Sequence, residues 1–346
     1  MSEPITHITQ VEIQQLWNEP ELNIKWNLHR DVNILAGDNG SGKSTILNLI
    51  LWSLLGTDIQ LYENTNGLAS SLSIVFNELS VVKLHRFKGN IKQLQKGAIA
   101  NESLKSILQD VIAQEGENCV HKTGTIRTSY RTLNDKPFRG REEFDELLQV
   151  NDICTFDEPL YTLEFARKIT GEEEVKTYLD LRMAQLEKNY LNYQVEIGKL
   201  ALKALSSGTD IEEVRQVNQQ LDAKKNLFLD MIDELFGATQ KRIDRDNNSI
   251  SFIKRGKTKL SPYNLSSGEK QMLIILLTAL VQNNKPTVMI MDEPELSLHT
   301  DWQEKLIDYI RQLNENVQII IATHSPSIVI NGWQDKIFEI DDILVK

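Results

Sequence analysis

A run of eight residues near the N-terminus has the composition of a phosphate-binding loop. The run GDNGSGKS, residues 37–44, follows the apolar stretch VNILA and leads into the breaker-free stretch STILNLILWSLL. Glycines let such a loop turn its backbone N–H groups toward phosphate oxygens, and a helix that begins there adds positive field. We expect Lys43 to reach the β- and γ-phosphates of a nucleotide, Ser44 to bind Mg²⁺, and Thr45 to contact the α-phosphate. The residues assigned to the nucleotide here are Gly37, Asp38, Asn39, Gly40, Ser41, Gly42, Lys43, Ser44 and Thr45.

Two adjacent carboxylates, Asp292 and Glu293, follow the apolar stretch TVMIM. A charge beside a buried strand is unfavourable unless it meets a cation or a reacting group. We expect Asp292 to hold Mg²⁺ through a water molecule. Glu293 would orient or deprotonate the water that attacks the γ-phosphate. The alternative, in which the pair only caps a helix, stays open at this point.

A histidine, His324, follows the apolar stretch VQIIIA. An imidazole at the end of a core strand can sense a γ-phosphate and help to hold the attacking water, because its pKa lies near neutrality. A purely structural histidine is the alternative. His324 comes after the next strand along the chain from the one that carries the carboxylates, and this position favours a catalytic role.

A second candidate phosphate site is the segment NLSSGEK, residues 264–270, about 26 residues before Asp292. Serine hydroxyls and a glycine backbone at a helix N-terminus can bind an anion, although an SSGE string alone is a common helix-capping signal. A chain with one phosphate loop has no evident use for a second site in cis, so we expect this one to act on the nucleotide of a second copy. The residues assigned to this contact are Ser266, Ser267, Gly268 and Glu269.

The elements that must position these motifs alternate between strands and helices. Short strands are expected in ITQVEI, LNIKWNL and VNILA, and two more within residues 72–86. A strand is also expected in DICTF, and two short strands around the Asp-Asn-Asn turn in residues 240–260. The continuous apolar strands TVMIMD and VQIIIA, each next to a helix, are typical of a parallel sheet buried on both faces.

A helical hairpin is expected between residues 171 and 236. Apolar residues recur with steps of four and three, and residues 206–210 interrupt the pattern. Either a projecting arm or a subdomain packed on the core would fit this pattern. The first seam contains Leu179, Met183, Leu186, Tyr190, Tyr193, Ile197 and Leu200.

Composition limits the class of protein. The net charge is -11, which argues against a generally basic nucleic-acid-binding surface, although residues 80–141 carry 12 Lys/Arg against 5 Asp/Glu. The two cysteines, Cys119 and Cys154, form no CxxC pair, so neither a disulfide framework nor a zinc site is indicated. No apolar run is long enough for a membrane helix, and the N-terminus has no signal-peptide pattern. We therefore expect a cytoplasmic protein without a membrane partner.

With these motifs together, the chain resembles the ABC ATPase superfamily, in the branch that includes RecF, Rad50, SMC and OLD proteins. The resemblance makes residues 37–45 the Walker A motif, 265–270 the signature, 288–293 the Walker B motif and 295–299 the D-loop. The segments around the signature and the D-loop further resemble stand-alone bacterial ATPases of the AAA_15 and AAA_21 types, many of them from anti-phage defence operons. The signature has Ser267 and Glu269 where transporters usually have glycine and glutamine, and neither a Q-loop glutamine nor an adenine-stacking aromatic is evident.

The resemblance implies an α/β fold: a P-loop ABC-type ATPase head with a mixed or parallel sheet core, an antiparallel β subdomain and a helical-hairpin insertion. The expected domains are residues 1–165 and 238–346, which form the head, and residues 166–237, which form the hairpin. The implied activity is Mg-ATP-dependent hydrolysis by a homodimer that encloses two ATP molecules.

Several functions share these motifs. The first is an ATPase that couples turnover to an effector or a nucleic acid, and the second is a slow ATP-gated scaffold or sensor that holds a separately encoded nuclease or toxin. A RecF-like role in DNA repair is a further alternative. The hairpin, the variant signature and the missing Q-loop argue against a transporter subunit.

Overall fold

The computed structural model describes residues 5–55, 69, 71–77, 80–90, 125–134, 136–137, 148–153, 175–206 and 211–345. The chain divides into two compact units and crosses between them inside the glycine-rich loop. Unit 1 comprises residues 1–30, 42–150 and 339–346, and unit 2 comprises residues 31–41 and 151–338. The units cut across the three expected ranges, because β3 of the N-terminal segment belongs to unit 2. Those ranges remain a prediction about where the hairpin is inserted.

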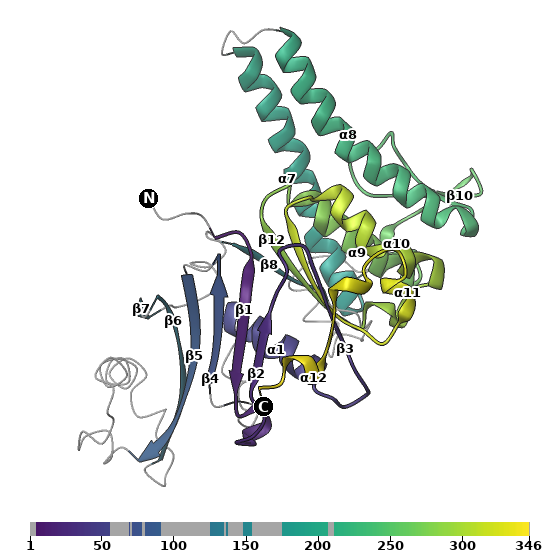
Figure 1. The fold of residues 1–346 in the computed structure, drawn as a ribbon. Coiled ribbons are helices and arrows are strands. Elements are labelled where there is room, and N and C mark those ends of the chain that lie inside the picture. Colours follow the sequence, from purple (N-terminus) through teal and green to yellow (C-terminus); the bar gives the residue numbers. More distant parts are fainter. Residues whose placement is uncertain are drawn as a thin grey trace. The chain divides into compact units, whose positions relative to one another are not determined.

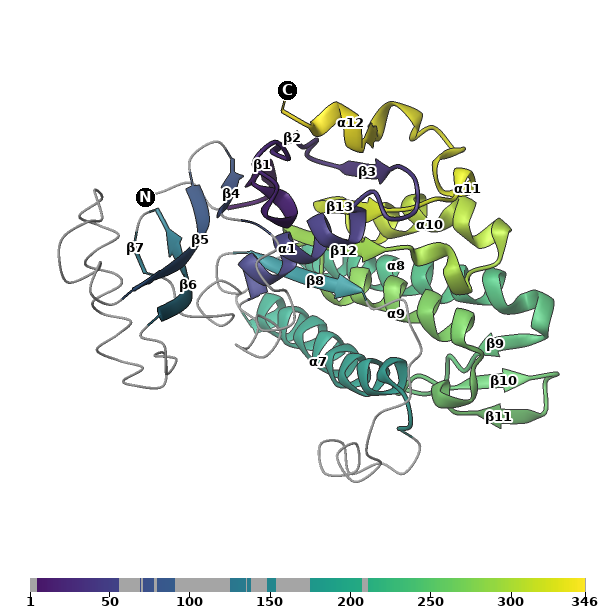
Figure 2. The same cartoon turned by 90° about the horizontal axis from the view of Figure 1, so that it is seen from below.

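Unit 2 is built on a five-stranded sheet with the order β14-β3-β13-β12-β8, which Figure 2 shows from below. Its strands are β3 (Val32–Ala36), β8 (Gln149–Ile153), β12 (Thr287–Asp292), β13 (Val317–Ala322) and β14 (Ile337–Glu339). The central strand β13 pairs in parallel with both β3 and β12. Every residue of β13 is buried, as the continuous apolar run predicts. The C-terminal ends of β3, β12 and β13 therefore lie at one edge of the sheet.

The helical hairpin of unit 2 consists of α7 (Tyr178–Ser206) and α8 (Ile211–Phe236). The predicted α7 seam is buried from Leu179 to Tyr193, and Ile197 packs against it. At their bases α7 and α8 pack on α9 (Ser267–Val281), and α8 also packs on α10 (Thr300–Leu313). The other ends of α7 and α8 run side by side beyond the sheet, as Figure 1 shows. The hairpin thus combines both expected arrangements: a packed base and a projecting end.

A small antiparallel sheet of unit 2 has three strands where the sequence analysis expected two. The strands are β9 (Lys241–Ile243), β10 (Phe252–Lys254) and β11 (Thr258–Leu260). The missed reversal lies at Arg255 and Gly256, which both have positive φ, 53° and 68°. Two successive left-handed residues form a tight hairpin turn, so the expected second strand is split into β10 and β11.

Unit 1 contains a six-stranded sheet with the order β2-β1-β4-β5-β6-β7. The described strands and α-helices of unit 1 are β1 (Ile8–Gln14), β2 (Ile24–Asn27), α1 (Lys43–Leu55), β4 (Ser71–Phe76), β5 (Ser80–Asn90), β6 (Thr125–Leu133), β7 (Lys136–Pro137) and α12 (Ile340–Ile343). Burial alternates along β4, so one face of the sheet is apolar, and α1 packs against β4 and β5. This is the expected antiparallel β subdomain.

The remaining helices in the described part of the chain are short. They are η1 (Leu16–Asn18), η3 (Gly237–Thr239), η4 (Pro262–Asn264), η5 (Pro294–Ser297), α11 (Pro326–Val329) and η6 (Gln334–Lys336). Two of them matter for the site, because η4 leads into the signature and η5 forms the D-loop.

Several predictions fall outside the described residues. They concern both cysteines, most of the basic segment 80–141, and the expected end of the DICTF strand. The strand in that region, β8, ends at Ile153. In the part of the chain that the structure describes, no helix combines the length and apolarity needed to cross a bilayer.

Candidate functional site

The glycine-rich loop joins β3, which ends at Ala36, to α1, which begins at Lys43. Gly37, Gly40 and Gly42 all have positive φ, at 146°, 80° and 104°. A Cβ on Gly42 would lie 2.8 Å from a ring carbon of Trp17, so both the backbone angle and the space favour glycine there. The local sequence therefore specifies a loop that side chains do not obstruct.

One buried polar atom supports a phosphate ligand at this loop. The Ser41 hydroxyl is buried, and among the described residues it has no hydrogen-bond partner. A buried hydroxyl without a partner is unfavourable, and phosphate oxygens are acceptors that would satisfy it. Lys43, whose side chain is buried, supplies the cation that a nucleotide phosphate requires, and the Ser44 hydroxyl supplies an oxygen ligand of the kind that Mg²⁺ binds. The loop residues thus fit the nucleotide that the sequence predicts.

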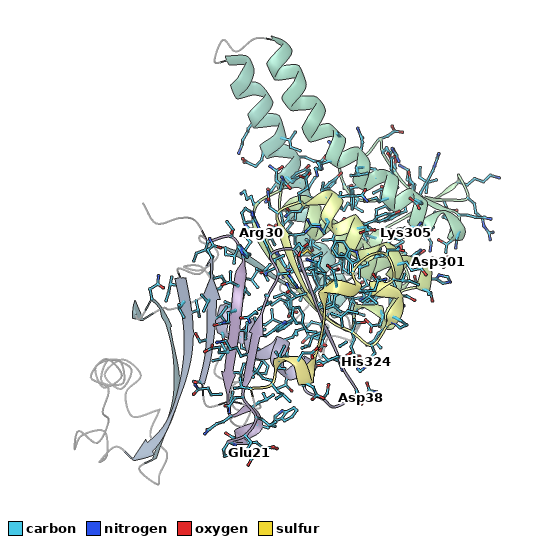
Figure 3. The ribbon with its side chains drawn as sticks, in the orientation of Figure 1. Glu21, Arg30, Asp38, Asp301, Lys305 and His324 are labelled. Carbon is cyan, nitrogen blue, oxygen red and sulfur yellow. The ribbon has the colours of Figure 1, made fainter. Side chains whose placement is uncertain are left out.

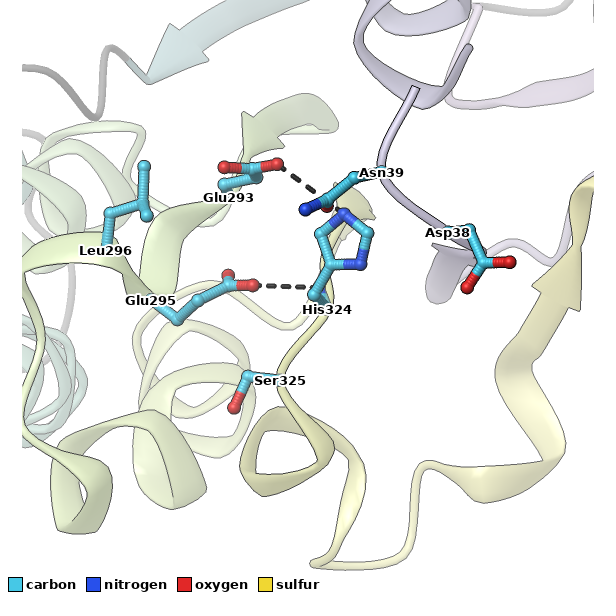
Figure 4. A pocket seen from close by; sticks show the side chains of 7 residues that line it. All are labelled: Asp38, Asn39, Glu293, Glu295, Leu296, His324 and Ser325. Carbon is cyan, nitrogen blue, oxygen red and sulfur yellow. Dashed lines mark hydrogen bonds and ion pairs between the residues drawn. The ribbon is translucent and has the colours of Figure 1, made fainter. Parts of the chain in front are cut away.

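A pocket of about 780 Å³ lies in unit 2 at the C-terminal edge of the parallel sheet. Its volume falls in the range of small-molecule sites. Figure 3 shows Asp38 and His324 at the same end of the unit, and Figure 4 shows the Asn39 side chain beside His324, with Glu293 facing them. The lining residues are Asp38, Asn39, Glu293, Glu295, Leu296, His324 and Ser325. The pocket therefore brings together three of the motifs singled out in the sequence.

Glu293 is held in an unusual backbone conformation. Its φ of 47° and ψ of 54° lie in the left-handed region, and its N–H donates to the Ala322 carbonyl at 2.8 Å. Non-glycine residues in this region are strained and concentrate at functional sites. The conformation turns the chain sharply out of β12 and places the Glu293 carboxylate 3.7 Å from Nε2 of His324. The last residue of β12, Asp292, lies directly before this turn.

A carboxylate that the sequence analysis did not assign to catalysis holds the His324 backbone. Oε1 of Glu295 accepts hydrogen bonds from the Thr323 hydroxyl at 2.6 Å and from the His324 N–H at 2.8 Å. The next residue, Ser325, donates through its hydroxyl to Oε1 of Gln303 at 2.6 Å. The D-loop and the histidine segment are therefore joined by hydrogen bonds within one chain.

The signature segment forms the N-terminus of α9. Ser266 is its N-cap, and Ser266 and Glu269 form a reciprocal capping box. Ser266 and Ser267 are exposed, whereas the Glu269 side chain is 2% exposed and forms an ion pair with Lys241 at 2.7 Å. Its Oε1 also accepts from the Thr239 hydroxyl at 2.8 Å. Of the four residues assigned to this contact, the structure thus leaves the serines at the surface and turns the Glu269 carboxylate inward.

The buried Glu269 carboxylate gives a pH-dependent prediction. Burial raises its pKa, but hydrogen bonds from Lys241, Ser266 and Thr239 outweigh burial, so the pKa lies below its usual value of 4.5. A lowered pKa stabilises the fold above pH 4.5, and this stabilisation is lost as the pH falls through the folded-state pKa. Glu269→Gln should lower the free energy of unfolding at pH 7 by about 3 kcal/mol, because it leaves Lys241 without its buried partner.

Urea denaturation of both proteins at pH 7 and below pH 4.5 tests this prediction. The difference in unfolding free energy should narrow as the pH falls below 4.5 and vanish once it has passed the lowered folded-state pKa of Glu269. Glu315→Gln makes the same change on an exposed carboxylate that pairs with Lys224, and it should leave stability unchanged. A difference in unfolding free energy between wild type and Glu269→Gln that stays constant with pH would contradict the lowered pKa of Glu269.

The fold and these motifs define a P-loop ATPase of the ABC type. A family model described as "AAA domain, putative AbiEii toxin, Type IV TA system" (AAA_21) matches residues 93–331, and the chain belongs to this family. The sequence-based prediction of an ABC-type ATPase similar to the AAA_21 proteins is confirmed.

Individual relatives agree with this class. The chain is 23% identical over 383 residues to "Retron Vc95 probable ATPase" of Vibrio cholerae serotype O1 biovar El Tor, covering 91% of this chain and 70% of the relative. It is 32% identical over 87 residues to "Retron Ec83 probable ATPase" of Escherichia coli, covering 22% of this chain and 16% of that protein. The fold is similar to that of an SMC head solved with the C-winged helix domain of ScpA, with a TM-score of 0.51 and 16% identity over 94% of this chain and 91% of that chain.

Proposed function

We propose that the chain hydrolyses Mg-ATP as a homodimer that closes around two ATP molecules and couples this cycle to a partner effector or a nucleic acid. The observation that carries the proposal is the pocket in which Glu293 and His324 face the Walker A residue Asn39. A carboxylate and an imidazole beside a phosphate loop are the groups that orient and activate a water for attack on a γ-phosphate.

Each residue would have a distinct role at the nucleotide. Lys43 would neutralise charge on the β- and γ-phosphates, while the loop N–H groups would hold their oxygens. Ser44 and Asp292 would hold Mg²⁺, which when bound neutralises the charge that develops on the phosphates. Glu293 would act as general base toward the attacking water, and His324 would hold that water and contact the γ-phosphate.

The second copy of the chain would supply the signature. The exposed Ser266 and Ser267 stand at the N-terminus of a 15-residue helix, where hydroxyls and the helix dipole favour an anion. In a face-to-face dimer of two identical heads, each signature would meet the γ-phosphate held by the other copy. Such a dimer has two equivalent composite sites.

The mass of the Glu293→Gln protein in solution, measured with and without Mg-ATP, tests this proposal. We expect a shift from monomer to dimer on addition of Mg-ATP, because slow hydrolysis keeps the closed state populated. The same protein with ATP and a chelator serves as the control. A mass that does not respond to Mg-ATP would overturn the ATP-dependent sandwich.

The biological role we propose is antiviral defence in the bacterial cytoplasm. It is supported by the similarity to two ATPases named for retrons and by the family description, which names a putative toxin. In this role the closed dimer would hold a separately encoded nuclease or toxin until ATP hydrolysis or a nucleic acid releases it. Co-purification of the tagged chain with products of its neighbouring genes, in wild type and in Glu293→Gln, would identify such a partner.

A further inference from the structure

The first turns of the signature helix α9 pack closely against the D-loop of the same chain and are hydrogen-bonded to it. A Cβ built on Gly268 would lie 2.2 Å from the Ser297 carbonyl oxygen, closer than real Cβ contacts allow. One turn later, Nε2 of Gln271 donates to the Pro294 carbonyl at 2.9 Å. Both contacts join α9 to η5, so the signature and the D-loop cannot move independently without breaking close packing.

The chemistry of Gln271 is unusual for its position. Its side chain is 0% exposed, and the six residues from Met272 to Leu277 that follow it in α9 are apolar and buried. Oε1 of Gln271 has no hydrogen-bond partner among the described residues. Burying an amide with half of its polar atoms unsatisfied is less favourable than burying leucine or methionine. Packing alone therefore does not explain a glutamine at position 271. The hydrogen bond to the Pro294 carbonyl does, because it requires a side chain that donates.

Pro294 lies directly beside the groups that would activate water. It follows Glu293, whose left-handed backbone sets the direction of the carboxylate. The next residue, Glu295, holds the Thr323 hydroxyl and the His324 N–H. A displacement of Pro294 would thus alter the position of Glu293 and, through Glu295, that of His324.

We infer that Gln271 is a positioning residue that couples the signature segment to Glu293 and His324 of the same chain. The inference rests on the proposed function, in which each signature contacts the nucleotide of the other copy. Binding of that nucleotide at Ser266 and Ser267 is then transmitted through α9 and Gln271 to the D-loop. Each copy thereby aligns its own general base when its signature has engaged ATP.

Gln271→Met tests this coupling, because methionine keeps an unbranched chain of similar length and removes the donor. ATP affinity should stay within about twofold of wild type, since Gln271 is not a pocket residue. The value of kcat should fall by about 10- to 100-fold, the cost of a small displacement of a catalytic group. Nucleotide titration and steady-state hydrolysis give the two values separately.

Thr278→Val is the matched control on the same helix. The Thr278 hydroxyl is 1% exposed and donates to the Ile274 carbonyl within α9, two turns from Gln271. It should leave kcat unchanged while altering thermal stability about as much as Gln271→Met does. The coupling would be contradicted if both variants lost the same fraction of kcat. It would also be contradicted if Gln271→Met lost as much ATP affinity as kcat, because Gln271 would then have only a structural role.

The proposed function and this inference fail on different results. If the mass of the Glu293→Gln protein does not change with Mg-ATP, the ATP-dependent dimer is overturned, independently of the result for Gln271→Met. A Gln271→Met protein that forms the ATP-dependent dimer and hydrolyses ATP with the wild-type kcat overturns the coupling and leaves the sandwich intact.

Discussion

Replacing Glu293 with glutamine is expected to lower the rate of ATP hydrolysis by about 10²- to 10⁴-fold, the contribution typical of a general base. Glutamine keeps the size of the side chain but cannot accept the proton of the attacking water. ATP affinity should change little, because the phosphate loop and Lys43 lie outside the substitution. Single-turnover hydrolysis and equilibrium binding of labelled ATP give the two quantities independently.

Two features of the site make this expectation specific. The Glu293 carboxylate lines the pocket and lies 3.7 Å from Nε2 of His324, whereas Oε1 of Glu295, the pocket carboxylate two residues later, is already bonded to the Thr323 hydroxyl and the His324 N–H. Glu315→Gln, the same change at an exposed position outside the pocket, should hydrolyse ATP at the wild-type rate. Unchanged turnover in Glu293→Gln would remove Glu293 from its role and direct attention to Glu295 as the alternative carboxylate of the pocket.

Much of the fold follows from local patterns in the sequence. The run VQIIIA is buried along its whole length, and VNILA and TVMIMD are buried up to their last residue. A continuous apolar run of that length predicts a strand covered on both faces. The α7 seam was predictable because apolar residues at heptad spacing lie on one face of a helix, where they can pack against a neighbouring helix. The turn at Arg255 and Gly256 was missed, because Arg-Gly is a weak turn signal and the strands on either side are only three residues long.

The sequence allows a site residue to be proposed where the motif consists of contiguous residues. Walker A, the carboxylate pair and the signature are each read from neighbouring positions. The contacts that hold them are not: Gln271 reaches Pro294 across 23 residues, and Glu295 reaches Thr323 across 28. Only the tertiary structure brings these pairs together. The available signal was weak, a single polar residue in front of an apolar run in α9.

Glu269 shows why a motif position alone does not assign a role. Its place in the signature suggested a nucleotide contact, but the chain folds its carboxylate onto Lys241 and onto the N-terminus of its own helix. The same residue type at an N3 position serves a capping box in many helices. Burial decides between these roles, and burial at one position of a short motif cannot be inferred from spacing.

The second large effect is expected when two inactive variants are mixed. Lys43→Ala should lose ATP binding, because it removes the buried cation from the phosphate loop. Ser267→Arg should still bind ATP but fail to hydrolyse it, because a bulky side chain at an exposed helix N-terminus blocks the approach of the other copy's nucleotide. Each variant alone should be inactive.

Composite sites predict recovery on mixing. A dimer of one copy of each variant has one site in which the intact loop of the Ser267→Arg copy meets the intact signature of the Lys43→Ala copy. Random pairing makes half of the dimers mixed and leaves one of two sites intact in each, so activity should return to roughly a quarter of wild type. Mixing two preparations of the same variant is the control.

The coupling through Gln271 lowers the recovered rate below that quarter. In the intact site of a mixed dimer, ATP is held by the Ser267→Arg copy, whose own signature is blocked, so its general base is not aligned. Recovery to the full quarter would support composite sites and contradict the coupling, whereas no recovery at all would contradict the two-site dimer unless the mixed protein still dimerises with Mg-ATP.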